Sequence, residues 1–175
     1  MRKLTVCLTL CLLLGLLASC QPRPASPPDY RTTGFTAELA WQAGALSLCA
    51  VASVEGATDN APARVTTLRF TAPPALKGVV LSREAGAATV ECHGMTASAE
   101  ALEALWRTAQ WLTASGTVTP VAITEQTGER LLYAERPTED GEGVYGLYLD
   151  PKSGIPHQIR LGDETLEIRS FTPRP

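Results

Sequence analysis

The sequence predicts a mainly β fold: a curved antiparallel, half-open β-barrel of about ten strands, with one amphipathic helix packed on its concave face. Three observations support this prediction. Apolar and polar residues alternate over most of the chain after residue 34, as in strands with one solvated face. Turn sequences that contain glycine separate these segments. One stretch, near residues 98–115, has helical periodicity instead.

The strand candidates are the segments in which this two-residue alternation runs between turn sequences. They are Phe35–Gln42, Ala45–Glu55, Arg64–Ala72, Gly78–Arg83, Ala87–Cys92, Val118–Glu125, Glu129–Arg136, Gly143–Asp150, Pro156–Leu161 and Thr165–Phe171. The residues from Asp150 to Gly154 read DPKSG, which is typical of a type I turn closed by a left-handed glycine. Consecutive strands joined by such turns predict an antiparallel meander.

The expected helix spans residues 98–115. Its apolar side chains recur at helical spacing on one stripe, at Leu102, Leu105, Trp106, Ala109 and Leu112. Ser98 is a candidate N-terminal cap, and Gly116 is a candidate C-terminal cap. A helix with one apolar stripe beside a curved sheet is expected to lie across the concave face of that sheet.

The N-terminus has the pattern of a bacterial lipoprotein signal. Two cations precede an almost unbroken apolar run that ends at Leu17 and is shorter than the roughly 20 residues that a membrane-spanning helix needs. Residues 17–20 read LASC and match the lipobox. We therefore expect a signal peptide at 1–19 and a diacylglyceryl group on Cys20, which would anchor an extracytoplasmic protein to the cell membrane. The alternative is an ordinary secretory signal.

The mature chain is expected to consist of a tether, residues 20–34, and one β domain, residues 35–172. The sequence from residue 21 to residue 34 is QPRPASPPDYRTTG. Its prolines and its lack of apolar periodicity indicate a semi-extended spacer. The alternative is that this arm packs on the domain.

The sequence has no recognisable catalytic or metal-binding constellation, and we expect neither an enzyme nor a cofactor. Cys92 and His93 are adjacent, so on a strand they would face opposite sides and could not hold one ion. The motifs of nucleophilic, zinc and phosphate-binding sites do not occur. A net charge of −3 over 175 residues argues against nucleic acid as a partner.

Two alternatives stay open for Cys49 and Cys92, the cysteines of the mature chain apart from Cys20. An even pair in an exported protein can form a disulfide. The phase of the two strands instead places Cys49 on the more polar side of its strand, away from Cys92, and favours two free thiols.

The candidate binding residues are Trp41, Trp106 and Trp111, because tryptophan is enriched at binding hot spots. On a helical wheel Trp111 falls opposite Leu102, so it lies either under a loop or at the rim of a binding surface. The concave face is either a filled core or a pocket for an acyl chain or a partner peptide.

Three short motifs, in their order along the chain, resemble those of one protein family. They are FTAEL from Phe35, LRFTAPP followed by LKG from Leu68, and YLDPKSGIP from Tyr148. Together they resemble the bacterial lipoprotein-localisation carriers (LolA/LolB-like) and their relatives in spore-forming Gram-positive bacteria, of the GerS type. The resemblance implies a half-open β-barrel with a helical lid over an apolar cavity, which in the carriers shields the acyl chains of lipoproteins.

The Gram-positive relatives are anchored lipoproteins of spore cortex maturation and germination that have a cell-wall amidase as a partner. The expected function is therefore that of a non-enzymatic, membrane-anchored envelope lipoprotein whose concave surface binds a protein partner or an acyl chain. Two alternatives are an accessory factor for such a peptidoglycan amidase and a purely structural envelope lipoprotein. A homodimer is also compatible with the sequence.

Overall fold

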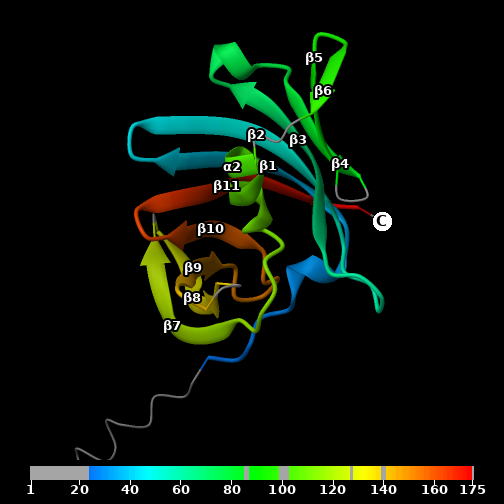
Figure 1. Cartoon of the computed structure of the whole chain (residues 1–175). Helices are drawn as coiled ribbons and strands as arrows, with labels where there is room; N and C mark the ends of the chain where they lie inside the picture. Colours follow the sequence, from blue (N-terminus) through cyan, green and yellow to red (C-terminus); the bar gives the residue numbers. More distant parts are fainter. Residues whose placement is uncertain (1–23, 85–86, 99–102, 127, 139–140, 175) are drawn as a thin grey trace, which may run out of the picture.

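The computed structural model describes residues 24–84, 87–98, 103–126, 128–138 and 141–174. These residues form a mainly β domain, built on one open antiparallel sheet of 11 strands (Figure 1). The strands are β1 (Phe35–Ala43), β2 (Leu46–Glu55), β3 (Arg64–Ala72), β4 (Val80–Glu84), β5 (Ala87–Cys92), β6 (Met95–Ser98), β7 (Thr119–Gln126), β8 (Glu129–Pro137), β9 (Val144–Leu149), β10 (Pro156–Leu161) and β11 (Glu164–Pro173). The prediction of a mainly β, antiparallel and unclosed sheet is confirmed.

The first and last strands pair at the centre of the sheet. Its order is β6-β5-β4-β3-β2-β1-β11-β10-β9-β8-β7, and Trp41 of β1 lies opposite Leu166 of β11. The register shifts between Glu38 and Leu39, and such a bulge increases the local twist and bends a strand. Because β6 and β7 lie at opposite edges, the chain between them has to cross the sheet.

Helix α2 (Glu103–Gln110) lies on this crossing and packs against β3 (Figure 1). Trp106 and Ala109 are buried on the side of the helix that faces the sheet, and Leu112 follows them into the core just beyond the helix end. The helix is shorter than the range expected from the periodicity, and residues 99–102 of that range lie outside the described residues.

A hairpin that the alternation did not predict precedes the helix. Strand β6 pairs with β5, and the turn between them places His93 and Gly94 at φ of 50° and 80°, as in the type I′ turn that matches strand twist. Strand β5 ends at Cys92, as the alternation predicts, and His93 lies in the turn that follows it. Ser98 belongs to β6, and residues 99–102, which lead from it to the helix, lie outside the described residues.

Part of the expected tether packs on the domain. A 3-10 turn, η1 (Tyr30–Thr32), precedes β1, and the Tyr30 side chain is buried. The Tyr30 ring meets the rings of Phe35 and Phe171 edge-on, with centroid distances of 6.0 and 6.3 Å. From Asp29 onward the chain therefore follows the alternative of a packed arm, because one large aromatic ring is enough to dock a short polar segment.

The remaining short element is η2 (Pro74–Leu76), between β3 and β4. Within the described part of the chain, no helix has the length and apolar character needed to cross a membrane.

Candidate functional site

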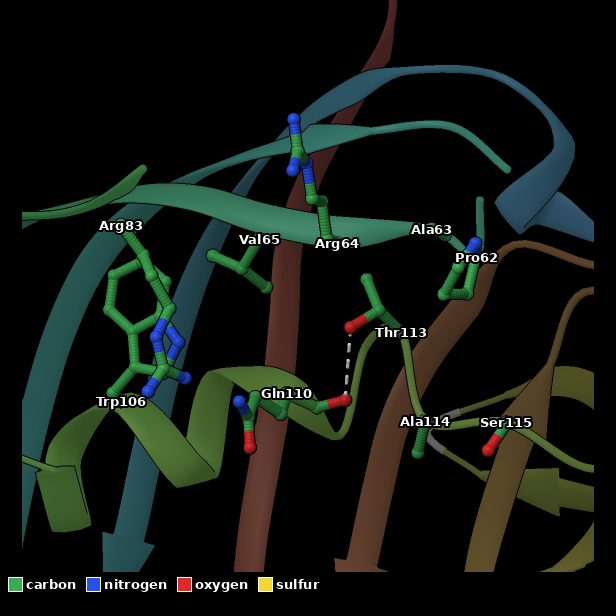
Figure 2. Close-up of a pocket in the computed structure, with 10 residues that line it drawn as sticks. All are labelled: Pro62, Ala63, Arg64, Val65, Arg83, Trp106, Gln110, Thr113, Ala114 and Ser115. Atoms are coloured by element: carbon green, nitrogen blue, oxygen red, sulfur yellow. Dashed lines mark hydrogen bonds between the residues drawn. The ribbon is translucent and has the colours of Figure 1, made fainter. Parts of the chain in front are cut away.

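A groove of about 330 Å³ opens between helix α2 and the strands β3 and β4 (Figure 2). We call it the α2 groove. Its lining comes from the start of β3, from one residue of β4, and from the helix and its exit: Pro62, Ala63, Arg64, Val65, Arg83, Trp106, Gln110, Thr113, Ala114 and Ser115. The volume lies at the lower end of the range that small ligand sites occupy, roughly 300–1,000 Å³.

The groove combines an aromatic wall with polar groups. The Arg83 guanidinium lies over the ring of Trp106, 5.9 Å from its centroid, as Figure 2 shows. This is the range of a cation–π contact. Arg64 extends away from the groove in the same view, and its Nε donates to Glu55 Oε2 at 2.7 Å. The groove therefore presents one arginine, which lies over a buried aromatic ring, with amide and hydroxyl groups along the helix side.

A second opening, the apolar slot, lies between α2 and the concave face of the central strands. Its lining is wholly apolar: Leu39, Trp41, Leu48, Ala50, Leu68, Phe70, Ala109 and Leu166. At its rim the indole Nε1 of Trp41 donates to Glu164 Oε2 at 3.2 Å. The slot measures only about 30 Å³, close to the share of one water molecule in the liquid. An acyl chain fits there only if the helix moves.

The chain that leaves the helix, residues 111–116, is held by side chains; we call it the exit segment. Its carbonyl oxygens have no helical partners of their own. The Trp111 oxygen accepts from Arg136 Nη2 at 2.6 Å, and the Leu112 oxygen accepts from the Tyr30 hydroxyl at 2.8 Å. Arg31 donates to the oxygen of Ala114 at 2.5 Å.

Asp29 and Arg31 form a partly buried ion pair beside the exit segment. Asp29 accepts from Arg31 Nε and Nη2, each at 2.8 Å, and these hydrogen bonds hold the pKa of the Asp29 carboxyl below its ordinary value. Burial raises the pKa of the Tyr30 hydroxyl, against the opposing effect of the nearby Arg136 charge.

Arg136 is the deepest charge of the described chain. Its side chain is 0% exposed, and its guanidinium lies 5.4 Å from the ring centroid of Tyr145. Its Nε and Nη1 have no hydrogen-bond partner among the described residues. Gly116 packs beside it: a Cβ at that position would stand in contact with Arg136 Cγ, at 3.4 Å, and the φ of +110° there favours glycine.

The three predicted tryptophans have different places. Trp41 lines the apolar slot and Trp106 lines the α2 groove. Trp111 lies in the core, 5% exposed, with its ring 5.9 Å from that of Tyr145. Of the two alternatives for Trp111, a covered position or the rim of a binding surface, the structure has the covered position. The three tryptophans do not lie on one surface.

The cysteines stand apart from both openings. Cys49 and Cys92 are free and half-buried, and Cys49 accepts a weak contact from Arg169 Nη1 at 3.6 Å. Cys20 and the expected signal peptide lie outside the described residues. Among the residues that are described, no group of three or more His, Cys, Asp or Glu is placed to hold a metal ion.

Sequence reasoning did not select the residues that hold the exit segment, Tyr30, Arg31 and Arg136. One signal for Arg136 was present, because it continues the core-facing alternation of Leu132 and Ala134 in β8. A charged residue at a core-facing position of a strand indicates that its side chain has a buried polar partner. No comparable signal marks Arg31 in a polar arm.

No family model matches the sequence, and no curated protein matches it either. Solved structures do. An uncharacterised conserved protein from Thermus thermophilus is 10% identical with a TM-score of 0.50, over 82% of this chain and 80% of its own. MucB of Pseudomonas aeruginosa is 13% identical with a TM-score of 0.51, over 84% of this chain.

The chain spans 55% of the length of MucB. A LolA superfamily protein from Nitrosomonas europaea is also among the similar structures, with 11% identity, a TM-score of 0.38, and coverage of 84% of this chain and 89% of its own. From the likeness to MucB and to the Thermus protein, the fold of this chain is the curved antiparallel sheet that those two structures have.

Proposed function

We propose that the protein is an anchored, extracytoplasmic and non-enzymatic binding protein that holds a segment of a partner protein in the α2 groove. The observation that carries this proposal is the mixed lining of the groove. The exposed ring of Pro62 offers apolar surface next to the buried side chains of Val65 and Trp106. Gln110, Thr113 and Ser115 offer polar groups beside it. A peptide needs both kinds of contact, because its side chains bury apolar area while its backbone amides need hydrogen-bond partners.

The identity of the partner is a further step of the same proposal. MucB forms a complex with MucA, which is a property of that protein. For this chain, the resemblance to the GerS type makes a cell-wall amidase the first partner to test, in the setting of spore cortex maturation and germination.

The groove is tested by photo-crosslinking. A photoreactive residue at Ser115, which lines the groove and is exposed, is expected to give a defined adduct with the purified amidase. The same residue at Ser170, exposed on β11 and outside the groove lining, is the matched control and should give roughly tenfold less adduct, as for a site outside an interface core. Equal adduct yields from both positions would reject the groove as the binding site.

The membrane anchor is tested at Cys20. We expect Cys20→Ser to prevent the incorporation of labelled palmitate and to move the protein from the membrane fraction to the soluble fraction, because two acyl chains are what makes such anchoring stable. Cys49→Ser is the matched control and should leave the label and the fractionation unchanged. Full labelling of the Cys20→Ser protein would contradict the proposed anchor.

A second candidate is the binding of an apolar chain, favoured by the wholly apolar lining of the slot beside Trp41. Because the slot is closed to about 30 Å³, this function depends on movement of α2.

A further inference from the structure

The N-terminal arm, residues 24–32, contacts the exit segment at successive carbonyl groups. The Tyr30 hydroxyl donates to the oxygen of Leu112 at 2.8 Å. Arg31 donates through Nη1 to Ala114 at 2.5 Å and through Nη2 to Gly116 at 3.4 Å. These three residues follow the helix end at Gln110. The carbonyls of Ala109 and Gln110, at the helix end itself, accept from the backbone N–H groups of Leu112 and Thr113. The arm instead holds the chain that follows the helix.

Arg31 is fixed in place before its guanidinium reaches the exit segment. The Asp29 carboxylate binds Arg31 through two guanidinium nitrogens and through its backbone N–H, at 2.8, 2.8 and 3.0 Å. The backbone N–H of Ala57 also donates to the Arg31 oxygen at 2.7 Å. A paired and oriented guanidinium loses little further freedom when it binds a carbonyl, so the arm is preorganised for this contact.

The proline end of the arm docks at a different place on the domain. Pro27 and Pro28 line a cavity of about 250 Å³ together with Leu149 and Gly154. A Cβ at Gly154 would collide with the carbonyl oxygen of Pro28. The arm thus bridges the turn between β9 and β10 and the exit segment of α2.

We propose that this arm is a latch on helix α2: lifting residues 29–31 releases the exit segment and lets the helix move off the concave face, which opens the apolar slot. Arg136 stays on β8 and keeps its contact with the Trp111 oxygen, so the exit segment pivots there. The latch itself is argued from the contacts alone; what enters the opened slot and the link to a membrane anchor rest on the proposed function. The proposed function also supplies an anchor at Cys20, upstream of the arm, through which a pull at the membrane would act on the helix.

The test compares the full chain with a Tyr30→Phe/Arg31→Met variant, which removes the donors and keeps the bulk of both side chains. Arg174→Met is the matched control, because the Arg174 side chain donates to Thr36 and Ser53, on β1 and β2, rather than to the exit segment. Hydrogen exchange followed by mass spectrometry reports on the helix, and the neutral fluorophore N-phenyl-1-naphthylamine reports on the slot.

In the variant we expect amides of residues 106–113 to exchange roughly tenfold faster, as for a local opening made more populated, with β1 and β11 unchanged. The probe should bind about tenfold more tightly. Unchanged exchange in the helix, or an equal rise across the whole sheet, would overturn the latch. Faster exchange in the helix without tighter probe binding would support the latch and reject the slot as a binding site.

Discussion

Replacing Trp111 by alanine is expected to lower the free energy of unfolding by about 3–5 kcal/mol, the usual cost of removing a large buried aromatic side chain. Trp111 is 5% exposed and its ring contacts that of Tyr145. Alanine keeps the backbone carbonyl that accepts from Arg136, so the loss comes from packing and from the cavity left behind. Urea unfolding followed by circular dichroism measures it.

Trp41→Ala is the matched comparison. Trp41 is only half-buried, at the rim of the apolar slot, so its replacement should cost less than half as much, in line with the smaller apolar area that it removes from water. A cost below about 1 kcal/mol for Trp111→Ala, the level typical of surface changes, would show that Trp111 is a surface residue and would restore it as a rim residue of the binding site.

Replacing Gly154 by alanine is expected to destabilise the domain and to detach the arm. Gly154 has a φ of +72°, which costs a residue with a side chain about 1 kcal/mol. The added Cβ also collides with the backbone of Pro28, and such overpacking adds typically 1–3 kcal/mol unless the neighbour moves away. Thermal unfolding measures the sum, and limited proteolysis at residues 24–29 measures the detachment.

Gly162→Ala separates the two effects. Gly162 has a φ of +57° and has no atom within 4 Å of the position where a Cβ would be, so it carries the backbone cost alone. We expect about 1 kcal/mol for Gly162→Ala with the arm still resistant to protease. If both variants unfolded at the same temperature and resisted protease equally, the close approach of Pro28 to Gly154 would not contribute to stability.

Local patterns were sufficient to predict most of the strands. The two-residue alternation predicts β3 and β10 at the bounds that the structure has, because each of these strands has one buried and one solvated face. The turn at Asp150 was also predictable: its carboxylate accepts from the backbone N–H of Lys152 and of Ser153, and Gly154 has the expected positive φ. These features depend on neighbours within a few residues.

The features that the sequence did not predict depend on distant contacts or on where an element ends. The helical wheel placed Trp111 opposite Leu102, but the helix ends at Gln110, so the wheel angle no longer applies and the chain turns Trp111 inward. The binding openings were not predictable, since Arg83 meets Trp106 only after β4 and the helix come together. The role of Tyr30 depends in the same way on Leu112, 82 positions away.

The pairing of β1 with β11 also determines when the domain can be completed. Phe35 lies opposite Pro173, so the middle of the sheet forms only after nearly the whole chain is present. A contact of such long sequence separation carries a large loop-closure entropy and slows folding. During synthesis β1 can pair with β2, but its other edge stays unpaired until β11 has been made. Unpaired strand edges promote association between chains. The last strand to be made is therefore the one that protects the first.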